Sequence, residues 1–181
     1  MSAPAPRPNP DIRGLFSLFP PTEFLARSEL VAPEELPEPY YGLLVHEHHM
    51  TVTVETYHGD AVDVEILEEH RGQHAYARKI LLRLRQSRRV VLFGVVRVHF
   101  RYCNPAVRDE ILGGRIPLGR VLINHNVLRH VMPTAFLRVT PAPSLTRWFG
   151  LGEPRPTYGR LALIQCDERP AVEVLEIVTP E

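Results

Sequence analysis

Two charged residues stand out because each lies on an otherwise apolar face of an expected strand. Residues 76–85 alternate in character, and Arg78 is the only cation on the face whose other members are Tyr76, Ile80, Leu82 and Leu84. Near the C-terminus, Glu176 is the only anion on the face that it shares with Val172, Val174 and Val178. Burying an unpaired charge is costly, so each of the two must be satisfied by an ion pair or by a ligand.

These residue types suit the floor of a small-molecule pocket. A buried arginine can form two parallel hydrogen bonds with the carboxylate of a ligand. A carboxyl group among aliphatic side chains is harder to ionise, which suits proton transfer near neutral pH. Two alternatives stay open at this point: Arg78 and Glu176 could pair with each other as a structural salt bridge, or the strand register could be shifted by one residue.

The stretch from Gly113 to Ile123, GGRIPLGRVLI, joins two expected short helices through three glycines and a proline. It could be a simple elbow, or a place where main-chain atoms approach a small ligand closely. The first helix should begin after Asn104 as N-cap with Pro105 in its first turn, and should stop at Gly113. The second should place Leu118, Val121, Leu122 and His125 on one face.

The elements around these residues predict an α+β domain. Period-2 runs indicate one hairpin from residues 50–57 and 61–68, another from 76–85 and 89–100, and strands at 134–140, 158–166 and 171–179. A short helix is expected at 40–45. We expect an antiparallel sheet of six or seven strands with short helices on one side. The loop at 141–156, with Trp148 and Phe149, has the composition of an ordered flap or lid.

Composition limits the organisation and the partners. The chain has 181 residues, 44% of them hydrophobic, which suits one domain over residues 23–181 behind a Pro-rich arm at 1–22. The formal net charge is zero, so we expect no nucleic-acid partner. No apolar run is long enough for a membrane span. Cys103 and Cys166 lack metal-site spacing and suit buried thiols in a reducing compartment, so we expect a cytoplasmic protein.

Four short motifs, in this order, resemble the chorismate pyruvate-lyases. They are MTVTVE (Met50–Glu55), RKILL (Arg78–Leu82), PLGR (Pro117–Arg120) and VLEIVTP (Val174–Pro180), and the resemblance covers residues 38–180. It implies the chorismate-lyase-like fold, with Met50–Glu55 beginning a strand. It also implies the elimination of pyruvate from chorismate to give 4-hydroxybenzoate, without a cofactor.

The resemblance also implies roles for individual residues. Arg78 would hold the ring carboxylate, and Glu176 would lie at the ether and hydroxyl end of the substrate. The backbone of Leu118 and Gly119 would lie against the ligand, and Met50 would pack on its ring. The segment between Met50 and Arg78 is shorter here than in the lyases, and it helps to form the flaps that close their pocket. The same fold also serves as the effector-binding domain of bacterial transcription regulators, so a non-catalytic module that binds an aromatic or carboxylic ligand is the alternative.

Three further signals carry less weight. The cluster from His46 to His49, HEHH, has no standard metal-ligand spacing and suits a solvated segment before a strand, so we expect no metal site. The basic run 78–89 is explained by the solvent-facing side of a strand, with Lys79, Arg83 and Arg85, followed by a turn. His125 could act as a general base, but a helix-capping role is the commoner use.

Overall fold

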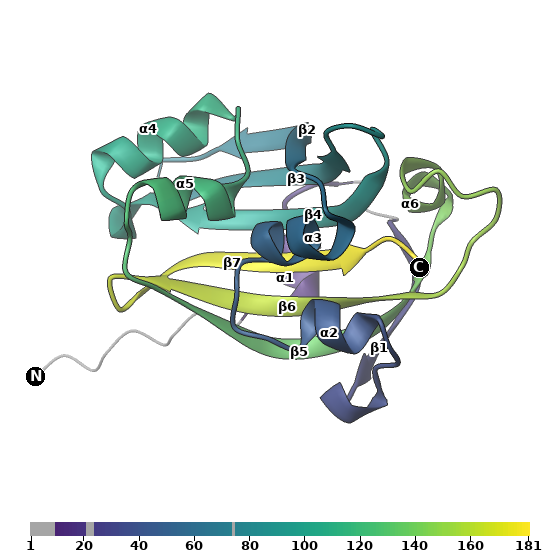
Figure 1. Cartoon of the computed structure of the whole chain (residues 1–181). Coiled ribbons are helices and arrows are strands. Elements are labelled where there is room, and N and C mark those ends of the chain that lie inside the picture. Colours follow the sequence, from purple (N-terminus) through teal and green to yellow (C-terminus); the bar gives the residue numbers. More distant parts are fainter. Residues whose placement is uncertain (1–9, 21–23, 74) are drawn as a thin grey trace, which may run out of the picture.

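In the computed structural model, the described residues are 10–20, 24–73 and 75–181. A seven-stranded antiparallel sheet runs through them in the order β1-β5-β6-β7-β4-β3-β2 (Figure 1). Its strands are β1 (Leu25–Val31), β2 (Val62–Arg71), β3 (Ala75–Leu84), β4 (Val90–His99), β5 (Arg129–Pro141), β6 (Thr157–Cys166) and β7 (Arg169–Val178). The predicted α+β class and antiparallel sheet are confirmed, and the last strand lies at the centre of the sheet between β6 and β4.

Short helices cover both faces of this sheet. On one face lie α2 (Tyr40–Leu44), α3 (Met50–His58), α4 (Pro105–Gly113) and α5 (Leu118–Asn124), and their apolar residues join the buried clusters of that face (Figure 1). On the opposite face lie α1 (Ile12–Phe16) and α6 (Pro143–Trp148). Two single turns of 3-10 helix, η1 (Pro33–Glu35) and η2 (Phe100–Tyr102), complete the elements. Among the residues described, no helix has the length and apolar character that a membrane crossing requires.

The prediction of a strand at residues 50–57 was wrong, because this segment forms α3. Gly59 closes the helix in the left-handed conformation at φ 65°. Met50, Thr51 and Val54 are its buried residues, which lie on one side of a helix. Alternating Thr and Val favours a strand locally, but contact with the sheet and with α5 decides in favour of the helix.

The connection between α4 and α5 agrees closely with the prediction from the sequence. The Asn104 side chain accepts a hydrogen bond from the Val107 amide at 2.9 Å, as an N-cap does. Gly114, at φ 65°, ends α4, one residue later than expected. Pro117 then precedes α5, in which Leu118, Val121 and Leu122 are buried. The buried side of α5 is therefore the one that the sequence predicted, and α4 packs through Val107 and Ile111.

The second covered face corrects the interpretation of Lys79 as solvent-facing. Its side chain is buried, with Nζ 4.4 Å from the centre of the Phe24 ring and 2.8 Å from a carboxylate oxygen of Glu68. The rings of Phe19, Phe24 and Trp148 surround its ammonium group, and of these only Phe19 lies in the predicted arm. Part of the presumed arm folds into α1, with Leu15 and Phe19 fully buried, whereas residues 1–9 and 21–23 lie outside the described part.

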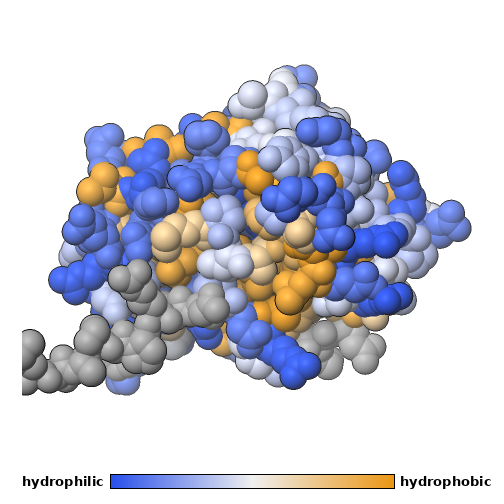
Figure 2. All heavy atoms as spheres, turned by 90° about the horizontal axis from the view of Figure 1, so that it is seen from below, coloured by the Kyte–Doolittle hydropathy of each residue, from blue (hydrophilic) through white to orange (hydrophobic). Residues whose placement is uncertain are grey.

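The loop at 141–156 is ordered, as expected, but it does not serve as a lid over the helices of the first face. Its helix α6 packs on the opposite face of the sheet, where Trp148 stacks on Phe93 with ring centres 5.7 Å apart. Apolar side chains also reach the surface, as Figure 2 shows for the face seen from below. Leu30 and Leu128 are the most exposed of the large ones in the described part, at 75% and 68%.

Candidate functional site

A small cavity lies between the sheet and the starts of α3 and α5. Its volume is about 40 Å³. The sheet contributes Ile80, Leu82, Leu92, Gly94, Val96, Ile164, Val174 and Glu176, and the helices and the elbow contribute His49, Met50, Thr51, Pro117, Leu118 and Gly119. Four of the five residues singled out in the sequence, namely Met50, Leu118, Gly119 and Glu176, therefore line one space.

Close approach of two helix starts builds the roof of this inner cavity. A Cβ atom on Gly119 would lie 3.1 Å from both the His49 Cβ and the Thr51 Oγ1. Such distances are tighter than ordinary van der Waals contact, so glycine is what allows α5 to lie against the start of α3. The glycine therefore permits a close approach between two helix starts, and the approach of this backbone to a ligand stays a prediction.

Arg78 lies beside the inner cavity rather than on its lining. Its neighbour on the same face of β3, Ile80, and its cross-strand partner on β4, Val96, both line the space. The side chain is fully buried, and Nε, Nη1 and Nη2 all lack a hydrogen-bond partner among the described residues. Burial lowers the pKa of Arg78 from its ordinary value, and the nearby Tyr76 hydroxyl and Glu69 carboxylate offset this only in part.

Glu176 is not the partner of Arg78. Its carboxylate accepts a hydrogen bond at 2.7 Å from Nε of Arg160, which is 1% exposed and lies on the neighbouring strand β6. The alternative in which Arg78 and Glu176 form a structural pair is therefore wrong. Glu176 thus has an ion-pair partner within the protein, whereas the nitrogens of Arg78 have no hydrogen-bond partner in the described part, although Tyr76 and Glu69 lie near enough to raise its pKa.

Arg160 also holds the segment that leads into α3. Nη1 donates to the carbonyl oxygens of Leu44 at 3.1 Å and His46 at 2.9 Å, and Nη2 donates to that of His48 at 3.2 Å. Arg160 is not among the residues predicted from the sequence, although the alternation that singles out Arg78 also singles out Arg160. Arg160 is the only charged residue on the face of β6 that contains Tyr158, Ala162, Ile164 and Cys166.

The histidine cluster precedes a helix rather than the expected strand, and it is solvated only in part: Glu47 and His48 are exposed, whereas His49 is buried. Desolvation, followed by the charge of Arg160, lowers the pKa of His46 to about 4. Desolvation, followed by the charges of Arg129 and Arg160, lowers the pKa of His49 to about 4. Both rings are therefore neutral near pH 7. No group of three or more His, Cys, Asp or Glu side chains in the described part is placed to hold a metal ion.

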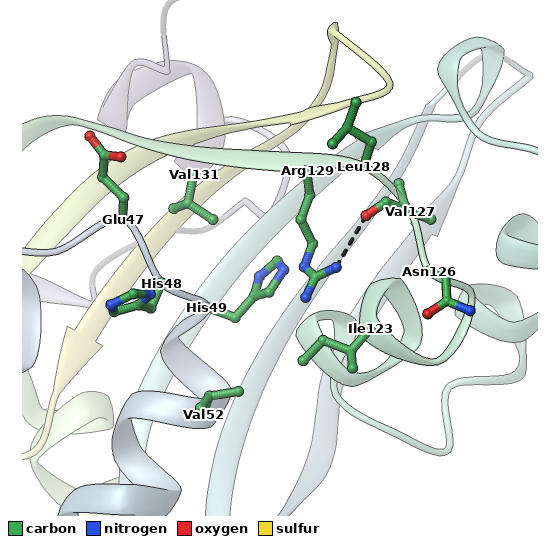
Figure 3. Close-up of a pocket in the computed structure, with 10 residues that line it drawn as sticks. All are labelled: Glu47, His48, His49, Val52, Ile123, Asn126, Val127, Leu128, Arg129 and Val131. Atoms are coloured by element: carbon green, nitrogen blue, oxygen red, sulfur yellow. Dashed lines mark hydrogen bonds between the residues drawn. The ribbon is translucent and has the colours of Figure 1, made fainter.

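An open groove adjoins the inner cavity at His49. This outer groove has a volume of about 630 Å³ and is lined by Glu47, His48, His49, Val52, Ile123, Asn126, Val127, Leu128, Arg129 and Val131 (Figure 3). The His49 ring is 7% exposed, and its Nε2 has no partner among the described residues. His49 lines both the outer groove and the inner cavity.

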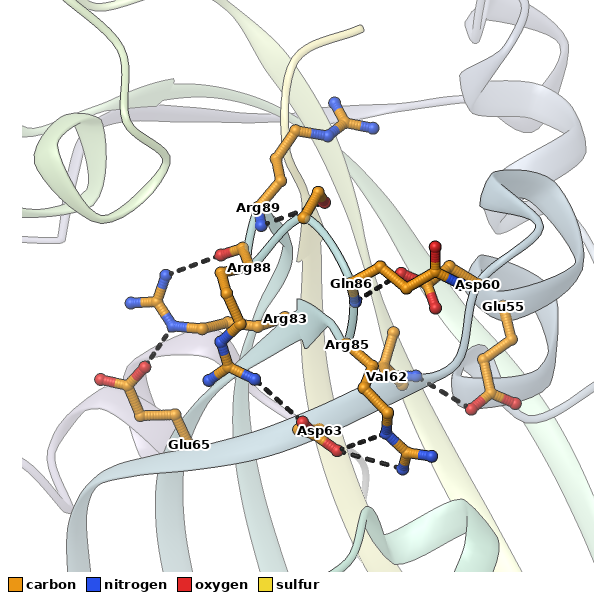
Figure 4. Close-up of polar contacts among 11 residues, drawn as sticks. Glu55, Asp60, Val62, Asp63, Glu65, Arg83, Arg85, Gln86, Arg88 and Arg89 are labelled. Atoms are coloured by element: carbon orange, nitrogen blue, oxygen red, sulfur yellow. Dashed lines mark hydrogen bonds and ion pairs between the residues drawn. The ribbon is translucent and has the colours of Figure 1, made fainter.

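Two other polar features have structural explanations. His125 is the C-cap of α5, and its ring pairs with Glu110, so a capping role fits it. Three basic residues of the β3–β4 hairpin, Arg83, Arg85 and Arg88, face acidic residues of β2 (Figure 4). Asp63 pairs with Arg85 at 3.1 Å and Arg88 at 2.9 Å, and Glu65 pairs with Arg83.

Comparison with known proteins finds similarity in structure alone. No protein-family model matches the chain, and no curated protein matches it either. PhnF from Mycobacterium smegmatis is similar with a TM-score of 0.56 and 8% identity, over 75% of this chain and 65% of that one. The match thus spans slightly less than two thirds of PhnF.

Two more solved structures are similar at lower TM-scores. One is a ligand-binding domain from Bordetella bronchiseptica that is assigned to the GntR family of transcriptional regulators, with a TM-score of 0.49, 12% identity, and coverage of 65% of this chain and 85% of that one. The other is a GntR-family transcriptional regulator from Bacillus cereus, with a TM-score of 0.46, 12% identity, and coverage of 66% and 92%. At such identities, structural similarity shows a shared fold and nothing finer. The similarity to PhnF agrees with the chorismate-lyase-like α+β fold that the sequence predicted.

Proposed function

We propose that this chain is a ligand-binding domain that takes a small carboxylic acid with an aromatic or apolar body beside Arg78. The observation that carries this proposal is the fully buried guanidinium of Arg78, whose three nitrogens have no partner among the described residues. A buried charge without a partner is expensive to keep, and an anionic ligand would supply the missing hydrogen bonds. The apolar residues of the inner cavity, such as Ile80, Val96 and Leu118, suit the body of such a ligand.

Binding without turnover is favoured by the state of Glu176. Its carboxylate is already engaged by Arg160, which in turn organises the segment before α3. Glu176 therefore has a structural role that does not depend on catalysis. The names of the GntR-family proteins agree with this proposal, but their similarity is too low to carry it.

Calorimetric titration with benzoate and 4-hydroxybenzoate tests the proposal. The intact chain should bind saturably, and Arg78→Met should weaken binding about tenfold or more because a charge-assisted pair is lost. Lys79→Met is the matched control, since it removes a buried cation from the adjacent residue on the opposite face of the sheet. Equal affinity in Arg78→Met, or no binding by the intact chain, would overturn the proposal.

A chorismate lyase is the second candidate function, and one observation favours it. Met50, Leu118, Gly119 and Glu176, which the lyase resemblance assigns to the substrate site, line the same cavity. Incubation with chorismate, followed by chromatography of pyruvate and hydroxybenzoate, tests this function. Turnover that is lost in both Glu176→Gln and Arg78→Met would support the lyase, and the isomer formed would identify the reaction. Binding of 4-hydroxybenzoate without turnover of chorismate would leave the ligand-binding domain.

A further inference from the structure

The inner cavity is too small for the ligand class proposed above. A dry protein cavity of about 150 Å³ accommodates benzene, whereas the inner cavity measures about 40 Å³. An aromatic acid can therefore enter only if a neighbouring side chain moves. The adjoining outer groove of about 630 Å³ offers the missing room, and His49 lines both spaces.

The Nε2 atom of His49 makes no hydrogen bond within the described residues. Packing therefore holds this side of the ring in place. Its Cβ and Cγ lie beside Gly119, at 3.1 and 3.2 Å from the position that a Cβ atom would take there. The residue stands immediately before α3, where the backbone is extended rather than helical. Rotation of this ring would therefore break no side-chain hydrogen bond from Nε2 within the described residues.

Arg129 supplies a cation on the far side of His49. It stands at the start of β5, and its guanidinium lies near the His49 ring in the groove (Figure 3). Its Nη1 donates to the Val127 carbonyl at 3.1 Å, and no carboxylate in the described part of the chain pairs with it. The acidic residue of the same groove, Glu47, is 71% exposed and lies 3.5 Å from His130 instead.

We propose that His49 is a movable partition and that the ligand spans both spaces, with one carboxylate at Arg78 and a second acidic group at Arg129. The ligand class is thus an elongated dianion with a planar, apolar middle. This inference rests on the proposed function and specifies its ligand. It assigns the outer groove as the second half of one site.

Matched pairs of acids test the inference by calorimetry and stopped-flow mixing. The pairs are benzoate with terephthalate and cinnamate with 4-carboxycinnamate, each titrated into the intact chain, Arg129→Gln, Arg78→Met and His49→Ala. In the intact chain, at least one diacid should bind about tenfold more tightly than its monoacid, because the second carboxylate gains a charge-assisted contact. Arg129→Gln should remove this gain and leave the monoacids unchanged.

Two further variants distinguish the role of His49 as a movable partition from the effect of the Arg129 charge. His49→Ala should speed the association of monoacids and diacids alike, because the closed arrangement no longer has to open. Arg138→Gln removes an exposed arginine from the same strand and should change nothing. Folding of each variant is checked by circular dichroism.

The outcomes distinguish this inference from the proposed function. Two outcomes would refute the dianionic ligand while leaving the proposed ligand-binding function intact. In the first, monoacids bind through Arg78 but neither diacid binds more tightly than its monoacid. In the second, Arg129→Gln weakens the binding of both members of a pair equally. Unchanged association rates in His49→Ala would overturn the partition. If none of the acids binds to the intact chain, the proposed function and this inference both fail.

Discussion

Arg160 and Glu176 face each other as directly paired residues of β6 and β7, with the arginine Nε 2.7 Å from a glutamate oxygen. The same guanidinium holds the carbonyl oxygens of Leu44, His46 and His48. The wall of the inner cavity and the segment that carries His49 are thereby fixed by one side chain. Arg160 positions the site, although it is absent from the cavity lining.

Arg160→Met should be strongly destabilising. It leaves Glu176 and the carbonyl oxygens of His46 and His48 without the Arg160 donor, and breaking a buried pair from one side costs about 3–5 kcal/mol. Urea unfolding measures the change in the free energy of unfolding. Arg138→Met, at an exposed position of β5, is the control and should stay within about 0.5 kcal/mol. A loss below about 1 kcal/mol in Arg160→Met would show that the contacts of Arg160 are not needed for the fold.

Arg78→Met should have the opposite effect on stability. An apolar side chain of similar length removes a buried charge that has no partner among the described residues, so the ligand-free protein should gain about 1 kcal/mol or more. The same variant should lose acid binding. Thermal unfolding with and without 4-hydroxybenzoate measures both effects. A destabilised Arg78→Met would instead indicate that the arginine serves the fold.

Gly119→Ala tests the close approach of α5 to α3. The new methyl group would meet His49 and Thr51 at 3.1 Å, and overpacking of this kind costs about 1–3 kcal/mol. The higher helix propensity of alanine offsets part of this loss. Chemical denaturation gives the net change, and acid binding should also change because His49 is displaced. Gly152→Ala is the control, since nothing lies within 4 Å of its added Cβ; an equal effect in the two variants would refute the packing argument.

Stability should fall as the pH is lowered from about 6.5 to about 4. The folded-state pKa of His49 is lowered from 6.5 to about 4, so in this range the unfolded chain binds the proton more readily than the folded protein. The contribution is fully present above pH 6.5, and a shift of this size corresponds to roughly 3 kcal/mol. His46 adds to the same trend with its pKa of about 4.

Urea unfolding at a series of pH values checks this dependence. His49→Gln should flatten the decline between pH 6.5 and 4, because one of the histidines with a lowered pKa is gone. His130→Gln, which changes a histidine with a 54% exposed side chain, should leave the decline in place. An unaltered slope in His49→Gln would contradict the burial of a neutral imidazole at this position.

Local sequence patterns predicted much of the frame of this site. The β3–β4 and β6–β7 hairpins follow from alternation and turn residues, and the start of α4 follows from Asn104 and Pro105. The same kind of pattern failed for residues 50–57, because alternating Thr and Val is compatible with a strand and with a short helix. The burial of Lys79 could not be predicted either, because it depends on the segments around α1 and α6, which are distant from Lys79 in the chain.

The sequence by itself determined that Arg78 and Glu176 lie on apolar faces, because side chains alternate along a strand with a period of two. Only the tertiary structure decided which charge has a partner. The pairing of β6 with β7 shifts by one residue between Ile164 and Gln165, and without this shift Arg160 would lie opposite Leu175 instead of Glu176. A one-residue shift exchanges the faces of a strand, so this irregularity places Arg160 against Glu176, while Arg78 has no partner among the described residues.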